Sequence, residues 1–352
     1  MNRVINMQRI KHCAAAAAVL LIMTGLIVYG RETSEAAVTA IKRCVYVIVP
    51  SLFAFMAFSN LMISTGAAGY ISRLTDMPFR ILLGIPKGTS ALFLISNIAG
   101  YPVGASMLSE TVSTGRLDKR SAEVMSIYCY AAGPAFIINT VGLGIFGRTS
   151  AGTAILFSVI STNLVLAAAV NRIYKPGSAS IPAAKPDAAA SLTGAVAKAG
   201  EAMIKMCGII ILFSAVTAMF QAFAGDKLPS GSARVFLLSA LEITNLTSLK
   251  DISGAALPIT AVTVGFGGVS VIAQLMSAAG RNYSLNLFLK WLPVRAGLNF
   301  GFAKLYCSLM PEVSIPAFAQ TSQIIVEIDN FIPSICLIMM IFLIVFKKTL
   351  DF

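Results

Sequence analysis

The sequence predicts an all-α polytopic membrane protein made of two related halves, each built around a broken, glycine-rich hydrophobic segment. Of its 352 residues, 57% are hydrophobic and 12% are charged, and the mean hydropathy is +0.82. A soluble protein of this size carries about 25% charged residues. Apolar runs of about 18 or more residues, the length that crosses a bilayer, recur along the chain. The sequence therefore predicts the lipid bilayer as the main partner.

The formal net charge of +12 could also indicate a nucleic-acid-binding protein. However, the Lys and Arg residues stand between the apolar runs, where they meet anionic lipid headgroups and set the orientation of the spans. We therefore expect no nucleic acid partner. The basic N-terminal tail and the basic residues between positions 73 and 120 favour a cytoplasmic N-terminus in the cell membrane. Lys347 and Lys348 would then lie outside if the chain crosses seven times, against the same rule.

Residues 1–37 are interpreted as a basic tail followed by the first transmembrane helix. The tail ends at His12, and an apolar run covers residues 13–30. A cleaved signal sequence is the alternative, but the run is longer than the usual apolar core of one and lacks a clear A-x-A site. We therefore expect an uncleaved helix.

The first repeat is expected over residues 38–172. Ser34 can cap a short amphipathic helix, and a polar stretch at 73–87 is expected at the membrane surface. The apolar segments are, in order, a span at 45–63, a broken segment at 91–113 and spans at 124–146 and 152–170. The broken segment is interrupted by polar residues, glycine and proline: Asn97, Gly100, Tyr101, Pro102 and Gly104. Gly133-Pro134 should kink or open the span that contains it.

A linker rich in Pro, Ala and Ser is predicted at 173–195 because it has no apolar periodicity. The second repeat, 196–352, contains a span at 206–222, an apolar stretch at 235–249, a broken segment at 257–279 and spans at 286–306 and 324–346. Three glycines split the second broken segment: Gly265, Gly267 and Gly268.

The evidence for duplication is a set of ordered matches across the linker. One offset places Gly100-Tyr101 on Gly265-Phe266, and a nearly equal offset places positions 41–44 on 204–207. If each broken segment is a re-entrant hairpin, each half crosses three times and the second half is inverted. Inverted repeats are typical of secondary transporters, whose sites lie at broken helices near the midplane. The alternative is that the glycines only allow close helix packing.

The candidate solute- or ion-binding residues lie at these interruptions. Glu242 is the strongest candidate, since an ionisable group in an apolar segment is costly. Arg295 is its candidate partner. The alternative to a binding role is that the two residues form an ion pair that only fixes helix packing. Asn299 shares the helical face of Arg295. The remaining candidates flank a break or follow Glu242. Their alternative role is to form hydrogen bonds with the backbone groups that the breaks leave without partners. These candidates are Asn97, Gly100, Tyr101, Pro102, Ser106, Gly133, Pro134, Thr244, Asn245, Gly265, Gly268, Ser270 and Gln274.

Enzyme signatures are not found. The six cysteines, at 13, 44, 129, 207, 307 and 336, form no C-x-x-C pair, so neither a disulfide framework nor a metal site is expected. The single histidine excludes a triad that needs an imidazole in the apolar segments. PKGTSA at 86–91 lacks the order of a phosphate-binding loop. We expect no catalysis and no cofactor.

Three motifs together resemble a known family. Ala99-Gly-Tyr-Pro-Val-Gly-Ala105, Cys129-Tyr-Ala-Ala-Gly-Pro-Ala-Phe-Ile137 and Leu241-Glu-Ile-Thr-Asn245 resemble the sporulation integral membrane proteins of the YlbJ type, in the nucleoside-recognition or Gate-domain group. The resemblance covers most of residues 40–350. It implies a likeness to parts of nucleoside transporters and to the pore of a ferrous-iron transporter. One departure is that Tyr130-Ala131-Ala132 stand where relatives often carry asparagines.

The leading hypothesis is a transporter-like or gate-like membrane protein that handles a small polar solute, nucleoside-like or related. The resemblance implies a role in sporulation, with either a second copy of the chain or other sporulation membrane proteins as further partners. The alternative, which the departure at Tyr130 favours, is a non-transporting structural or assembly protein of the developing spore membrane.

Overall fold

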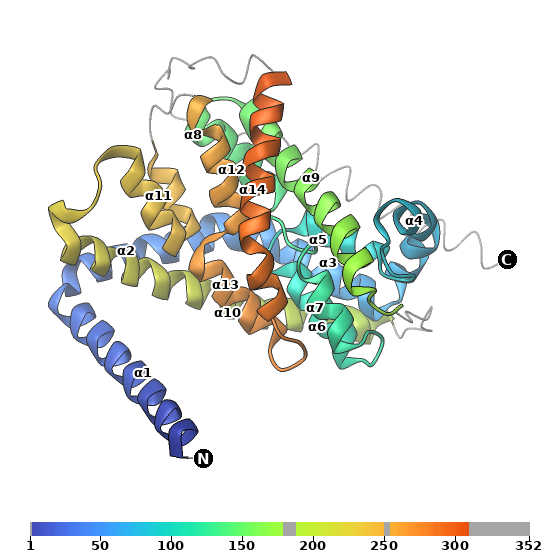
Figure 1. The fold of residues 1–352 in the computed structure, drawn as a ribbon, viewed down its shortest axis with the longest axis horizontal. Coiled ribbons are helices and arrows are strands. Elements are labelled where there is room, and N and C mark those ends of the chain that lie inside the picture. Colours follow the sequence, from blue (N-terminus) through green and yellow to red (C-terminus); the bar gives the residue numbers. More distant parts are fainter. Residues whose placement is uncertain (1, 179–187, 250–253, 310–352) are drawn as a thin grey trace. The chain divides into compact units, whose positions relative to one another are not determined.

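The computed structural model describes residues 2–178, 188–249 and 254–309, and every regular element in these ranges is helical (Figure 1). Residues 2–178 form α1 (Asn2–Val28), α2 (Gly30–Arg43), the π-helix η1 (Cys44–Ile48), α3 (Val49–Ser64), α4 (Ala67–Leu83), α5 (Ser90–Ala99), α6 (Val103–Ser113), α7 (Lys119–Met125), the π-helix η2 (Phe136–Leu143), α8 (Gly144–Phe146) and α9 (Thr149–Tyr174). The later ranges form α10 (Ala188–Ala224), the 3₁₀ turn η3 (Gly225–Lys227), α11 (Gly231–Leu241), the 3₁₀ segments η4 (Ile243–Ser248) and η5 (Gly254–Ala256), α12 (Leu257–Phe266), α13 (Gly268–Ala279) and α14 (Asn286–Leu309).

Several of these helices have the length and composition of membrane spans. Three do so alone: Thr149–Tyr174, Leu192–Lys227 and Leu257–Ala279. The number rises to five if each of two bent pairs is one span: Ala16–Val28 with Gly30–Ile48, bent by 93°, and Leu52–Ser64 with Ala67–Leu83, bent by 85°. The described residues thus form an all-α, multi-pass membrane protein, as the composition predicts.

Some element boundaries differ from those predicted. Helix α10 begins at Ala188, inside the predicted linker 173–195. The predicted span at 286–306 forms α14, but it is not among the candidate spans; it carries three basic residues, Lys290, Arg295 and Lys304. The predicted span at 324–346 lies outside the described residues.

The stretch predicted to be polar, 73–87, is largely helix α4. Its exposed side chains include Leu74, Met77 and Ile81, which share one helical face. Such a face suits a helix that lies along the membrane interface. On its other side, Asp76 accepts hydrogen bonds from the backbone N–H of Gly88 at 2.6 Å and from Ser90 Oγ at 2.5 Å. Helix α4 therefore fixes the start of α5, the first arm of the first broken segment.

The first broken segment, α5–α6, folds back on itself. Residues eight apart in a straight helix are separated by about 12 Å. A Cβ atom built on Gly104 would lie 2.8 Å from the Cβ of Ser96, so the two arms must turn towards each other at Gly100–Pro102. The Tyr101–Pro102 peptide bond within this turn is cis.

The second broken segment follows a different course. Helices α12 and α13 are interrupted at Gly267, but together they form one candidate span, Leu257–Ala279. The second broken segment therefore does not fold back as α5 and α6 do, because its two arms together form one candidate span. Contacts across the halves are extensive: α10 packs on α2 and α3, α13 on α6, and α14 on α9. The described residues of both halves lie in one compact unit.

Candidate solute site between the broken helices

The first break packs against a third one, which ends at Gly133-Pro134, where the sequence predicts a kink or an opening. Gly100 has a φ of +80°, and a Cβ atom there would lie 2.8 Å from the backbone nitrogen of Gly133. Only glycine combines this conformation with this close approach. Gly104 similarly lies against the carbonyl group of Cys129. The turn at Gly100–Pro102 thus rests on the backbone of residues 129–133.

This third break covers residues 126–133, between α7 and the helix that starts at Pro134. A kink or an opening at Gly133-Pro134 within a span was predicted; the interruption is longer, because it begins several residues before that pair and ends at Gly133. Residues 126–132 are buried. Their backbone carbonyl groups therefore need partners from elsewhere in the protein.

Arg295 of α14 supplies those partners. Its guanidinium donates hydrogen bonds to the carbonyl oxygen of Ile127, to the carbonyl oxygen of Tyr130 at 3.4 Å and to Asn163 Oδ1 at 2.8 Å. Only 2% of the Arg295 surface is exposed. The charge is thus held by neutral oxygen atoms, an arrangement in which a planar guanidinium with several donors is more effective than an ammonium.

Asn163, in the middle of α9, extends this network. Its Nδ2 atom donates to the carbonyl oxygen of Tyr130 at 2.9 Å and to Asn97 Oδ1 at 2.6 Å. Asn97 Nδ2 in turn donates to the carbonyl oxygen of Phe93 at 2.8 Å. The chain of bonds joins α14, α9, α5 and the third break. Arg295 and Asn163 both donate to the carbonyl oxygen of Tyr130, and Asn97 joins the network by accepting a hydrogen bond from Asn163.

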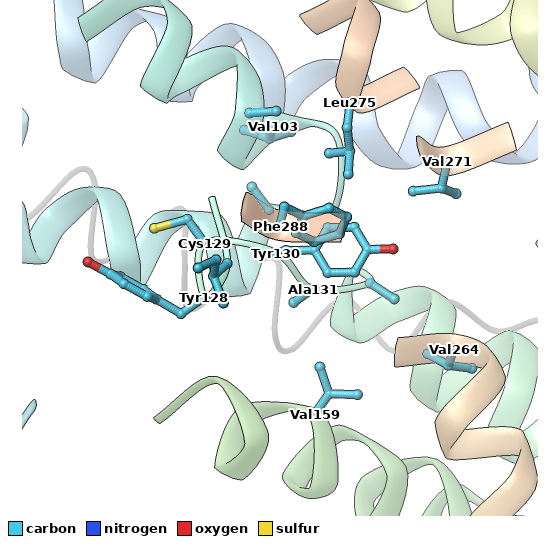
Figure 2. Close-up of a cluster of buried hydrophobic side chains, with 14 of the residues drawn as sticks. Val103, Tyr128, Cys129, Tyr130, Ala131, Val159, Val264, Val271, Leu275 and Phe288 are labelled. Atoms are coloured by element: carbon cyan, nitrogen blue, oxygen red, sulfur yellow. The ribbon is translucent and has the colours of Figure 1, made fainter. Parts of the chain in front are cut away.

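An aromatic cluster ties the first and third breaks to the second. The Tyr101 and Tyr130 rings stack with centroids 5.0 Å apart, and Phe288 meets Tyr130 edge-on at 4.9 Å. Figure 2 shows Tyr130 against Phe288, with Val264, Val271 and Leu275 of the second broken segment in the same cluster. Tyr130 Oη donates to the carbonyl oxygen of Phe266 at 2.6 Å, and Tyr101 Oη donates to that of Val264 at 3.3 Å. The two tyrosines thus satisfy carbonyl groups at the end of α12.

The residues around Glu242 form a separate group. Glu242 ends α11, and its Oε1 atom accepts a hydrogen bond from the backbone N–H of Thr244 at 3.1 Å. Asn245 Nδ2 donates to the carbonyl oxygens of Glu242 at 2.9 Å and Leu238 at 3.3 Å, so Asn245 caps the end of α11. The expected pairing of Glu242 with Arg295 is not formed, because the guanidinium is bonded to residues of the third break and α9.

Two glycines of the second broken segment admit close neighbours. Gly265 lies directly against the side-chain amide of Asn299, which is fully buried, and a Cβ atom at Gly265 would overlap that amide. Gly268 has a φ of +85° and lies against the carbonyl oxygens of Ser239 and Ala240. The glycines therefore allow close packing, as the alternative interpretation holds, and they also mark the break.

A polar cleft of about 230 Å³ opens beside these breaks, between α6, α10 and α13. Three predicted residues line it: Pro102, Ser106 and Gln274. Asn282 adds an amide that donates to Ser109 Oγ at 2.7 Å, and Lys198 pairs with Glu110 at 2.7 Å. The amide of Gln274 makes no hydrogen bond within the described ranges, so it is available to a solute. Donors, acceptors and both signs of charge thus surround a space of small-molecule size.

The structure therefore distributes the predicted residues over four places. Pro102, Ser106 and Gln274 line the cleft, while Asn97, Gly100, Tyr101, Gly133, Pro134 and Arg295 belong to the network around the third break. Glu242, Thr244, Asn245, Gly268 and Ser270 surround the end of α11, and Gly265 and Asn299 contact each other. Sequence reasoning missed Asn163, Lys198 and Asn282, and it identified Tyr130 only as a departure from the family pattern. Asn163 carried a usable signal, since an amide in the middle of a 26-residue apolar helix is costly without a partner.

Comparison with known proteins gives one weak relative. Over 147 residues the chain is 23% identical to the sporulation integral membrane protein YlbJ of Bacillus subtilis (strain 168), and the match covers 42% of this chain and 36% of that protein. No protein-family model and no solved structure matches the chain. The similarity agrees with the resemblance to proteins of the YlbJ type and with a multi-pass membrane protein.

Proposed function

We propose that this chain is a transporter-like or gate-like integral membrane protein that handles a small polar solute, nucleoside-like or related, during sporulation. The observation that carries the proposal is the polar cleft beside the breaks, lined by the second arm of each broken segment and by α10. Broken helices that border a polar space near the middle of the membrane are typical of transporter binding sites. The name of the Bacillus subtilis relative supplies the link to sporulation.

The spacing of the helices supports the proposed duplication. Four successive helices of the first half have counterparts in the second half at a nearly constant offset along the chain. Helices α4 and α11 begin at Ala67 and Gly231, and α5 and α12 begin at Ser90 and Leu257. The starts of α6 and α13, and those of α7 and α14, are separated by almost the same distance in sequence. The cleft then lies where equivalent arms, α6 and α13, pack on each other.

The experiment that tests this function is solute binding by the purified full chain. Nucleosides, amino acids and small carboxylic acids are titrated into protein in nanodiscs, and binding is measured by calorimetry. Gln274→Leu removes the unbonded amide in the cleft, and we expect it to weaken binding about tenfold or more, the cost of a lost hydrogen bond to a buried group. Gln221→Leu, on the exposed surface of α10, is the matched control and should bind as the natural protein does.

Two results contradict the proposal: no binding to any solute of the panel by folded protein, or equal binding by Gln274→Leu and the natural chain.

The alternative, a structural or assembly protein of the developing spore membrane, is favoured by a specific observation. Tyr101, Tyr130 and Phe288 pack against one another between the breaks, so aromatic side chains occupy this place. Under the alternative, cleft variants keep the sporulation phenotype of the natural chain.

A further inference from the structure

The end of α11 holds a buried carboxyl group whose oxygens are incompletely bonded. Glu242 is 1% exposed. The hydroxyl groups of Thr244 and Ser270 lie beside its carboxyl group. Glu242 Oε2, Thr244 Oγ1 and Ser270 Oγ are all buried, and none makes a hydrogen bond of normal geometry within the described residues. Three buried oxygen atoms of neighbouring residues therefore lack a hydrogen bond of normal geometry in the described part of the chain.

The charges near this point do not compensate the carboxylate fully. Arg43, at the end of α2, acts on the carboxylate from a distance, but no ion pair with Glu242 is formed among the described residues. The Cys44 thiol and the Tyr101 phenol are the other titratable groups that face it. Arg295 is held by the third break. A buried carboxylate without a direct partner is expensive, so a ligand that supplies positive charge would be stabilised here.

The backbone at this point contributes partial charges of both signs, because the C-terminal end of α11 and the N-terminal end of α13 meet here. Helix α11 ends at Leu241, and the C-terminal end of a helix carries partial negative charge on its last carbonyl groups. Gly268 brings the start of α13, and with it Ser270, against the carbonyl groups of Ser239 and Ala240. Hydroxyl, carbonyl and carboxylate oxygens together are the ligands that hard metal cations prefer.

We propose that Glu242, Thr244 and Ser270 form a binding site for a monovalent metal cation of about the size of sodium. A single carboxylate with neutral oxygens balances one positive charge, whereas sites for calcium usually gather several carboxylates. Binding of the ion does not depend on the proposed transport function. Only a role of the ion in coupling rests on it.

The test is thermal unfolding of the full chain in detergent micelles, with sodium chloride replaced by choline chloride at constant ionic strength. Sodium should raise the unfolding midpoint in a saturable way, because a ligand that binds only the folded state stabilises it. Choline is too large for the site and should not. Glu242→Gln should lose the sodium-dependent shift, while Glu35→Gln, on the exposed surface of α2, should keep it.

Ser270→Ala removes one oxygen without removing the charge, so it remains informative if Glu242→Gln fails to fold. It should raise the half-saturating sodium concentration about tenfold, the effect of losing one good contact. The proposal is overturned if sodium and choline act alike, or if either site variant keeps the sodium response unchanged. A midpoint that responds to pH but not to sodium would assign the site to a proton and would also overturn it. No solute is present in this test, so its failure leaves the cleft hypothesis intact.

Discussion

Arg295 and Tyr130 contact each other in two ways: the guanidinium donates a hydrogen bond to the Tyr130 carbonyl oxygen, and its Cζ atom lies 4.9 Å from the centroid of the Tyr130 ring. One basic residue on α14 thus holds both the backbone and the side chain of the third break. Because Tyr130 also stacks on Tyr101 and bonds to the end of α12, this contact connects all three breaks.

Arg295→Lys should therefore destabilise the protein strongly although the charge is kept. A lysine cannot reach Ile127, Tyr130 and Asn163 with the fixed geometry of a guanidinium. We expect a loss of about 3 kcal/mol in the free energy of unfolding, since buried carbonyl groups lose their donors. Chemical unfolding in detergent measures it. Arg281→Lys, at an exposed position, is the control, and an equal effect of the two substitutions would refute the role of Arg295.

Gly100→Ala should disrupt the first break. Alanine is strained at a φ of +80°, and its Cβ atom would collide with the backbone of Gly133. The expected cost is about 2 kcal/mol or more, measured by the same unfolding experiment.

The matched control is Gly208→Ala. Gly208 lies inside α10, where a Cβ atom meets nothing within 4 Å, so alanine should stabilise the helix by about 0.5–1 kcal/mol. Similar changes at both positions would show that the close contact of Gly100 with Gly133 is not formed.

The sequence predicted the first two breaks, but of the third it predicted only the interruption at Gly133-Pro134, for a physical reason. Gly100 and Pro102, or Gly265 to Gly268, stand out inside apolar runs because they weaken a helix locally. Residues 126–133 contain no comparable signal before Gly133, and they stay non-helical because Arg295 and Asn163, distant in sequence, bind their carbonyl groups. Hydrogen bonds from residues distant in sequence therefore override the local helix propensity of this segment. The same reason explains why Glu242 and Arg295, both costly in an apolar segment, could be identified as important but not assigned their partners.

Asp118 gives a pH-dependent prediction outside the membrane spans. Burial would raise the pKa of Asp118, but hydrogen bonds from the hydroxyl and backbone N–H of Ser121, at 2.6 and 2.9 Å, hold the pKa below its ordinary value. A group whose pKa is lowered on folding stabilises the folded state above its unfolded pKa of about 4 and loses this effect as the pH falls through the folded pKa.

Asp118→Ala should thus cost about 1 kcal/mol at neutral pH, where the carboxylate caps α7, and less in acid. Asp118→Asn keeps a capping side chain and should remove the pH dependence with a smaller loss of stability. A difference between Asp118→Ala and the natural chain that stays constant down to strong acid would contradict this account. Unfolding midpoints recorded across the acidic range measure it.

Cys44 and Cys207 provide a test of how the two halves pack. Their thiol groups contact each other between the end of α2 and α10, and the two cysteines occupy equivalent positions in the ordered matches between the halves. Mild oxidation of the folded chain should form an intramolecular disulfide, detected by peptide mapping and by the loss of two hydrogen atoms in intact-protein mass spectrometry. Cys207→Ser should abolish it and Cys13→Ser should not. A cross-link that involves another cysteine would contradict the packing.

The most direct test of the central claim is solute uptake by the full chain reconstituted in liposomes. The account predicts saturable uptake of at least one small polar solute, strongly reduced by Gln274→Leu and retained by Gln221→Leu. Protein that is folded and reconstituted but moves no solute, or moves it equally well with Gln274→Leu, would contradict a transporter-like function of the cleft.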